Sequence, residues 1–192
     1  MSFLDFIDTS TSQSSRRAFL GKSGMLLSGT AVALLAGREA LAKGTKGSAA
    51  SDARILNTAL GAELEAIAAY QLGAESGLLQ KPVLDLAVTF QGHHKQHAEL
   101  LSKTIVTLGG KPVVAKSKYT FPTDKLKTQT DVLRFASLLE KGAVSAYLGA
   151  VPIFDNRDLA KAAASILGDE SMHWAILRNA LGEPPVPSAF MS

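Results

Sequence analysis

The stretch QGHHKQHAELLSKTIVTLGG, residues 91–110, decides the fold, and it holds three of the chain's four histidines. This stretch predicts a helix, because apolar residues and one histidine recur at steps of three and four, the spacing of one side of a helix. The buried side is predicted to carry His94, Ala98, Leu101, Ile105 and Leu108. The glycine pair at 109–110 predicts the end of that helix. Because burying a polar ring without a partner costs free energy, a core-facing His94 needs a group to bind.

Three other segments show the same spacing, so the sequence predicts four helices. A Ser51/Asp52 cap should open the first, and Pro82 suits the first turn of the second. The segment 111–129 has two prolines and no sustained period, which indicates a long crossing connection. We therefore predict an all-α four-helix bundle of two antiparallel hairpins joined by a long crossover loop. The expected helices cover residues 51–75, 82–110, 130–150 and 156–181.

A polar residue interrupts the apolar seam in the middle of every predicted helix. Glu63 precedes Tyr70 by seven residues, and His94-x-x-His97 begins 31 residues after Glu63. The second hairpin repeats this arrangement: Glu140 precedes a tyrosine by seven residues, and Glu-x-x-His begins 30 residues after it. A Glu on one helix and a ligand pair at i, i+3 on the next, present twice, is the arrangement that holds two metal ions inside a bundle. The predicted metal ligands are Glu63, His94, His97, Glu140, Glu170 and His173.

Each of these residues also has an interpretation without a metal. A histidine such as His97 or His173 is often a hydrogen-bonded core residue, but matching positions opposite two glutamates favour ligands. Tyr70 and Tyr147 fit core tyrosines with a polar tip, and they also fit hydrogen-bond donors to the ligands. Two further residues lie off the seam. His93 is predicted at the surface or beside a ligand, and Asp169 is a weaker alternative to Glu170.

The first 42 residues have a different composition from the rest of the chain. SSRRAFLGKSGMLLSGTAVALLAG, residues 14–37, places Arg16 and Arg17 before an apolar run that starts at Gly24. That run is shorter than the roughly 20 residues of a spanning helix, and Ala40-Leu41-Ala42 matches an A-x-A cleavage signal. We predict a removable export signal at residues 1–42 and one bundle domain at residues 43–192.

Composition excludes several classes of protein. The chain has 192 residues and a net charge of +3, and without residues 1–42 it keeps 16 basic and 14 acidic side chains, a net charge of +2. No basic cluster with interleaved aromatics is present, so the sequence gives no sign of a nucleic-acid partner. The absence of cysteine excludes disulfides, zinc–thiolate sites and thiol nucleophiles.

Two resemblances follow from these motifs. SRRAFLG, residues 15–21, resembles a twin-arginine export signal, which implies the twin-arginine machinery as a partner and a periplasmic location. The helical part resembles the exported ferritin-like domain family, in its desiccation-related branch. This second resemblance is carried by LNTALGAELEAIAAY (56–70), HHKQHAELLSKTIVTLGGKP (93–112), YTFP (119–122), ASLLEKGAVSAYLGA (136–150) and ILGDESMHWAILRNALGEPPVPSAF (166–190).

The family resemblance implies a ligand set of Glu, Glu-x-x-His, Glu and Glu-x-x-His. Five positions match that pattern, namely Glu63, His97, Glu140, Glu170 and His173. His94 departs from it, since the family has a metal-bridging Glu there. An imidazole binds through one nitrogen, so we expect Glu170 to be the bridge that remains and a second ion to bind more weakly.

These features predict a metal-binding protein. Carboxylate-rich bundle sites with imidazole suit iron or manganese, one or two ions, and such metals act on dioxygen or peroxide. The leading interpretation is a periplasmic di-iron or di-manganese protein that handles ferrous oxidation or peroxide in stress protection, which would make it a ferroxidase or a peroxidase-like or catalase-like enzyme. The alternative is a structural, stress-related binding protein with one metal or none. No membrane span is expected in the mature chain, and a homodimer is compatible with the sequence.

Overall fold

The computed structural model of this protein describes residues 49–191, and the predicted export signal lies outside these residues. Within them the chain forms four long helices and no strand, so the predicted all-α class is confirmed. Two short 3-10 turns, η3 (Thr123–Lys125) and η4 (Val151–Ile153), interrupt the connections. The long helices are α4 (Ala49–Glu75), α5 (Lys81–Thr107), α6 (Gln129–Ala150) and α7 (Arg157–Ala180).

Local chemistry sets the helix ends close to the predicted positions. Thr128 caps α6 by accepting a hydrogen bond from the backbone N–H of Asp131, while the Asp131 carboxylate accepts one from the Thr128 N–H. Just after the C-terminal end of α5, Gly109 has a φ of +77°, a conformation that favours glycine and lets the chain turn away from the helix. These signals are local in sequence. The helices could therefore be located from the hydrophobic periodicity and from the capping residues, glycines and prolines at their ends.

The predicted Ser51/Asp52 cap is wrong. The helix α4 begins earlier, at Ala49, so Asp52 already lies in its first turn and is buried. Its two carboxylate oxygens instead accept hydrogen bonds from the backbone N–H groups of Asp155, at 3.2 Å, and Asn156, at 3.1 Å. Asp52 therefore ties the start of the first helix to the turn that leads into α7, a contact between segments about a hundred residues apart.

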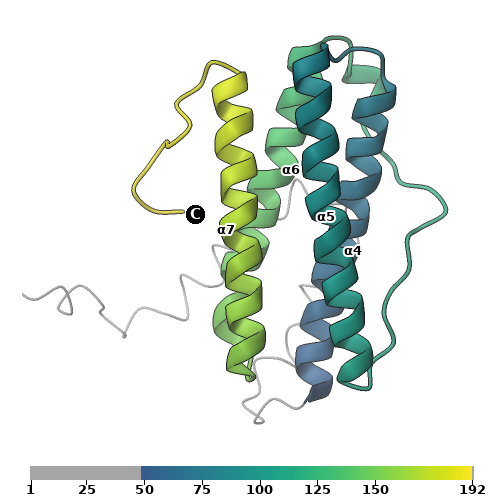
Figure 1. Ribbon diagram of the computed structural model, residues 1–192, viewed down its shortest axis with the longest axis vertical. Helices are drawn as coiled ribbons and strands as arrows, with labels where there is room; N and C mark the ends of the chain where they lie inside the picture. The colour runs from purple at the N-terminus through teal and green to yellow at the C-terminus, as the bar shows by residue number, and fades with distance from the viewer. Residues whose placement is uncertain (1–48, 192) are drawn as a thin grey trace, which may run out of the picture.

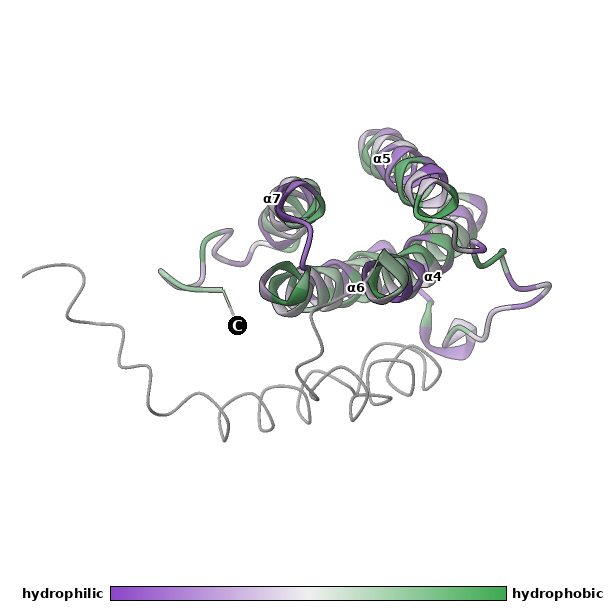
Figure 2. Ribbon diagram, turned by 90° about the horizontal axis from the view of Figure 1, so that it is seen from below, coloured by the Kyte–Doolittle hydropathy of each residue, from purple (hydrophilic) through white to green (hydrophobic). Residues whose placement is uncertain are grey.

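The four helices pair as two antiparallel hairpins, α4 with α5 and α6 with α7 (Figure 1). The connection between the hairpins crosses the length of the bundle on its outside. Asn57 of α4 fixes its start, since the side chain donates to the Lys111 carbonyl at 3.0 Å and accepts from the Val113 N–H at 2.8 Å. Viewed along the bundle, α4 and α6 lie next to each other, and α5 and α7 lie on the same side of that pair (Figure 2).

Two apolar clusters form the core, and a polar layer separates them. The larger cluster packs the first half of α4 against the ends of α5 and α6 and the start of α7, around Leu60, Ile105 and Ile166. The smaller one packs around Tyr70, Phe90, Leu133 and Leu177. Within residues 49–191, no helix combines the length and apolar composition needed to cross a bilayer.

Candidate metal centre

The polar layer contains all six residues predicted as metal ligands. Five of them are buried to an exposure of at most 3%: Glu63, His94, Glu140, Glu170 and His173. The sixth, His97, keeps 13% of its side chain exposed. Each helix contributes at mid-length, because the 3.6-residue period that builds the core stripe also places these positions inward. The structure thus brings polar residues from all four helices together in one buried layer.

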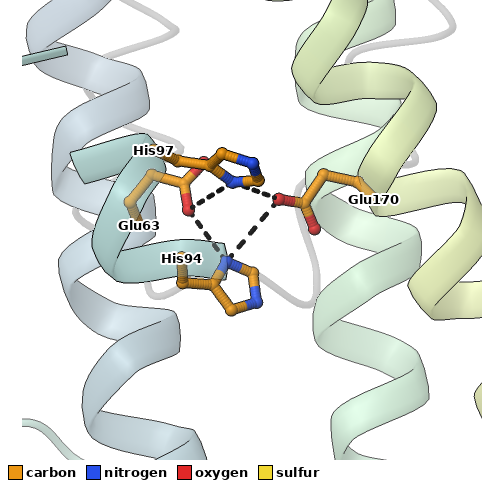
Figure 3. Close-up of side chains that lie close together, drawn as sticks. All are labelled: Glu63, His94, His97 and Glu170. Atoms are coloured by element: carbon orange, nitrogen blue, oxygen red, sulfur yellow. Dashed lines mark hydrogen bonds and ion pairs between the residues drawn. The ribbon is translucent and has the colours of Figure 1, made fainter. Parts of the chain in front are cut away.

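One group of ligand atoms joins the first hairpin to α7 (Figure 3). His94 Nδ1 is 2.8 Å from Glu63 Oε2 and 3.6 Å from Glu170 Oε1. His97 Nδ1 is 3.6 Å from the same Glu63 oxygen and 3.1 Å from Glu170 Oε1. Two imidazole nitrogens and two carboxylate oxygens therefore converge from α4, α5 and α7.

A second group lies beside the first and shares two residues with it. His94 Nε2 is 3.3 Å from Glu140 Oε1. His173 Nδ1 is 3.5 Å from both Glu140 Oε1 and Glu170 Oε2. Glu170 thus presents one oxygen to each group, as expected of a bridging carboxylate. His94 also faces both groups, through its two different nitrogens, an arrangement that the sequence did not predict.

Several buried polar atoms in this layer make no hydrogen bond, although other polar atoms lie nearby. They are His97 Nδ1, Glu140 Oε2, both oxygens of Glu170 and His173 Nδ1. Buried polar atoms without a partner are rare in folded proteins, and each calls for an explanation such as an ion. Among the described residues, every buried side-chain nitrogen or oxygen atom without a hydrogen bond lies in this one layer.

The spacing of the atoms also fits a metal. Nitrogen and oxygen ligands bind first-row metals at about 2.0–2.2 Å, so neighbouring ligands of one ion lie roughly 3–3.5 Å apart. The nitrogen–oxygen distances given above run from 2.8 to 3.6 Å, and all ligand atoms of a group lie within 4.8 Å of one another. The donor set, three carboxylates with imidazoles, suits iron or manganese. The residues present therefore fit the metal that the sequence predicted.

Two tyrosines hold the outer glutamates in a crossed arrangement. The Tyr147 hydroxyl of α6 donates to Glu63 Oε1 of α4 at 2.6 Å, and the Tyr70 hydroxyl of α4 donates to Glu140 Oε1 of α6. Seven residues rise about 10 Å along a helix, so both bonds can form at once only if α4 and α6 run antiparallel. The crossover connection provides that direction. Each tyrosine ring lies in an apolar cluster and only its hydroxyl reaches the polar layer.

The electrostatics of the metal-free layer favour charged imidazoles. Burial would lower the pKa of His94, but hydrogen bonds with Glu140 and Glu63 outweigh burial and raise that pKa to about 11. Burial is likewise outweighed at His97 and His173, where carboxylate contacts raise each pKa to about 9. The same contacts lower the pKa of Glu63 and Glu140 against the opposing effect of burial.

The tyrosines stay protonated in this environment. Burial raises the pKa of Tyr70 and Tyr147 well above the usual tyrosine value, and the negative charge of Glu140 and Glu63 raises it further. Each hydroxyl therefore remains a hydrogen-bond donor to its glutamate.

Sequence reasoning undervalued two residues that lie against the ligands. Asp169 Oδ2 is 3.3 Å from His97 Nε2 and 3.3 Å from His173 Nε2, and His93 Nδ1 is 2.8 Å from His173 Nε2. Asp169 lies four residues before His173, and His93 lies four before His97. That i, i+4 spacing was the available signal, since it places side chains on the same helix face.

Phe90 was missed altogether. Its ring stacks on His173 with 4.0 Å between centroids and 22° between planes. It lies on α5 one turn before His94 and is 3% exposed, so it fixes the orientation of an imidazole that belongs to α7. An apolar residue on a core stripe carries no sequence signal for such a role.

Comparison with known proteins identifies the family. A model of the ferritin-like domain matches residues 51–183, which is more than two thirds of the chain and includes every residue of the polar layer. The chain belongs to the ferritin-like domain family. This ferritin-like chain also resembles a crystal structure of a conserved hypothetical protein from Mycobacterium tuberculosis, at 23% identity and a TM-score of 0.65, over 76% of this chain and 99% of that one. At that identity the likeness concerns the fold alone. No curated protein sequence matches this ferritin-like chain significantly.

Proposed function

We propose that this ferritin-like chain is a periplasmic metal-binding protein of the exported, desiccation-related branch. It would hold one or two iron or manganese ions and use them in ferrous oxidation or peroxide removal during stress. The observation that carries the proposal is the set of buried nitrogen and oxygen atoms without hydrogen bonds, all in the layer where the ligand residues converge.

The residues have distinct tasks in such a centre. Glu63 and His97 would hold an ion from the first hairpin, Glu140 and His173 from the second, and Glu170 would bind on both sides. When bound, iron or manganese supplies the electrons that reduce dioxygen or peroxide. The two apolar clusters keep bulk water away from the layer, which strengthens its electrostatic interactions.

The tyrosines fix the geometry of the outer carboxylates. Because Tyr147 donates to Glu63 Oε1, the other oxygen of Glu63 is directed at the imidazoles of His94 and His97. Partners that orient metal ligands in this way usually contribute 10- to 100-fold in metal affinity.

Metal content tests the proposal directly. We expect the full chain, reconstituted with ferrous iron without oxygen, to hold one or two ions per chain by elemental analysis. Glu170→Ala and His173→Ala should each weaken binding by more than about tenfold, since each removes a direct ligand rather than an orienting partner. The matched control is Gln96→Ala, because Gln96 is exposed on α5 and bonds only its own helix backbone. Parent-like binding in Glu170→Ala would show that the centre is wrongly assigned.

Activity and export are tested separately. Oxygen and peroxide consumption by the iron-loaded and manganese-loaded protein distinguishes ferrous oxidation from peroxide removal. For export, Arg16→Lys with Arg17→Lys should abolish periplasmic accumulation and leave the bundle unchanged, since twin-arginine signals depend on that pair. Normal periplasmic levels of this variant would refute the proposed route.

A second candidate function has its own supporting observation. His94 bonds Glu63 at 2.8 Å and Glu140 at 3.3 Å through its two nitrogens, so a protonated ring places a positive charge between two carboxylates. That positive charge offsets part of the negative charge of the carboxylates, as a bound metal ion would. It supports a structural, stress-related protein with one metal or none. Elemental analysis decides: a chain that stays metal-free under anaerobic iron or manganese loading would favour this candidate.

A further inference from the structure

Three potential ligand atoms meet at the outer edge of the polar layer, between α5 and α7. His93 Nδ1 is 2.8 Å from His173 Nε2 and 3.2 Å from Asp169 Oδ2, and the Asp169 oxygen is 3.3 Å from His173 Nε2. We name this cluster of His93, Asp169 and His173 the peripheral triad. None of the contacts assigned to the buried centre uses these three atoms.

The peripheral triad runs from the solvent to the interior. The His93 side chain is 38% exposed and that of Asp169 is 23% exposed, whereas His173 is 2% exposed. His173 belongs to both places: its Nε2 faces the peripheral triad, and its Nδ1 faces Glu140 and Glu170 at 3.5 Å. Stacking on Phe90 holds the ring in this orientation.

Proton sharing alone does not account for the contacts in the peripheral triad. If one proton lies between His93 Nδ1 and His173 Nε2 at 2.8 Å, the nitrogen that accepts it also faces Asp169 Oδ2, at 3.2 Å from His93 or 3.3 Å from His173, with no proton between them. Both of these atoms carry lone pairs, so at that distance they repel each other unless a second proton or a cation lies between them. A cation among these atoms would be bound by lone pairs that the hydrogen bonds leave unused.

We propose that the peripheral triad binds one divalent first-row transition metal ion. Two imidazoles and one carboxylate with open positions form a donor set that suits ferrous iron, zinc or cobalt, and the remaining positions can be filled by water at this partly exposed place. The distances of 2.8 to 3.3 Å are those of neighbouring ligands on one ion.

Sharing of His173 couples the peripheral triad to the buried centre. A neutral imidazole offers one nitrogen lone pair, so an ion on Nε2 in the peripheral triad and an ion on Nδ1 in the buried centre exclude each other. An ion that arrives from solvent meets His93 and Asp169 first. The peripheral triad would therefore load first and pass the ion inward, a step that rests on the proposed function, whereas binding at the peripheral triad does not.

The peripheral triad has a second state once the buried centre is filled. His173 then carries its proton on Nε2, which lies against Asp169 and His93 and can donate to either. In that state the same atoms orient a metal ligand through its second nitrogen.

Zinc binding to a chain that lacks two of the three inner carboxylates tests the peripheral triad. The full chain with Glu63→Gln and Glu140→Gln keeps the side-chain shapes and leaves the peripheral triad intact. By equilibrium dialysis with Zn²⁺ and elemental analysis, we expect one ion per chain. Addition of His93→Ala should weaken that binding at least about tenfold, while Gln96→Ala in the same background should leave it unchanged. Helix content by circular dichroism verifies that each variant is folded.

Two results would overturn the proposal: no zinc on the folded double variant, or equal zinc with and without His93. The outcomes also separate the two proposals. If the unmodified chain binds one ion, the double variant keeps it and His93→Ala loses it, the peripheral triad stands and the buried centre fails. If the unmodified chain binds ions that the double variant cannot hold, and His93→Ala changes nothing, only the buried centre stands.

A rate measurement covers the case in which the double variant does not fold. Uptake of Co²⁺ by the otherwise unmodified chain, followed by its visible absorption, should slow about tenfold in His93→Ala, because loading scales with occupancy of the peripheral triad. Uptake at the parent rate would overturn the proposal.

Discussion

Removal of metal should make the stability of this protein fall as the pH rises above neutrality. Carboxylate contacts raise the pKa of His97 and His173 to about 9 in the folded, metal-free chain, against an ordinary value of 6.5. Below pH 6.5 both rings are protonated in the folded and in the unfolded chain, so the ion pairs contribute fully. Between pH 6.5 and 9 the unfolded chain has lost these protons and the folded chain still holds them, so the contribution is lost progressively.

The magnitude follows from the number of protons retained. Each proton that only the folded chain holds lowers the free energy of unfolding by about 1.4 kcal/mol per pH unit. The histidines share Glu63, Glu140 and Glu170, so their contributions do not add fully. One retained proton is therefore a cautious basis, and over the interval from 6.5 to 9 it amounts to about 3 kcal/mol. That is a large fraction of the 5–15 kcal/mol typical of a domain.

Denaturant unfolding of chelator-treated protein, followed by circular dichroism at several pH values between 6 and 9, measures this loss. The metal-loaded protein should show the opposite dependence. A metal binds the unprotonated imidazole, so protons compete with it and its stabilising effect grows as the pH rises. The two states should thus have slopes of opposite sign across the same interval.

A matched variant assigns the slope to the histidines. His97→Gln removes one titrating ring and keeps an amide of similar reach, so the metal-free slope should become clearly shallower. A metal-free parent whose free energy of unfolding is constant from pH 6.5 to 9 would refute the reasoning, because it would mean that the buried rings are already neutral at pH 6.5.

Three further outcomes are expected. Tyr147→Phe removes the donor to Glu63 and should lower the stability of the metal-free chain by about 1–3 kcal/mol in denaturant unfolding; a change below a few tenths would show that the hydroxyl bond is unimportant. His94→Glu restores a two-oxygen ligand and should move anaerobic ferrous titrations toward two ions per chain, with faster consumption of oxygen or peroxide; binding curves identical to the parent would place His94 outside the centre. Asp52→Ala leaves the Asn156 N–H without its acceptor and should cost about 1–2 kcal/mol, and hydrogen exchange should localise the loss at the start of α7 rather than elsewhere.

Helix positions and inward ligands could be predicted because both depend on short-range spacing. The step of three and four residues that marks Leu60 and Ile105 as core also marks Glu63 and His94 as inward, so one pattern yields the bundle and the ligand set. The short, long and short connections between the predicted helices indicated the pairing of helices and the crossover.

Contacts between distant segments could not be predicted in this way. Asp52 looked like a cap for its own helix, because capping residues are recognised from their near neighbours, yet its partners are about a hundred residues away. His93 lies off the core stripe of α5, and only the approach of α5 to α7 shows that it reaches His173. The two-sided placement of His94 depends on the rotation of its ring, which no spacing encodes.

The crossed tyrosine bonds have a consequence for how the molecule can be divided. A cut in the exposed crossover, residues 111–128, would yield two hairpin peptides. Neither peptide contains a complete ligand group, because the first lacks Glu170 and the second lacks His94, and each tyrosine hydroxyl would have lost its acceptor to the other peptide. The halves should therefore recover metal binding only when mixed, which makes this bundle a candidate for a split reporter whose signal is the centre itself.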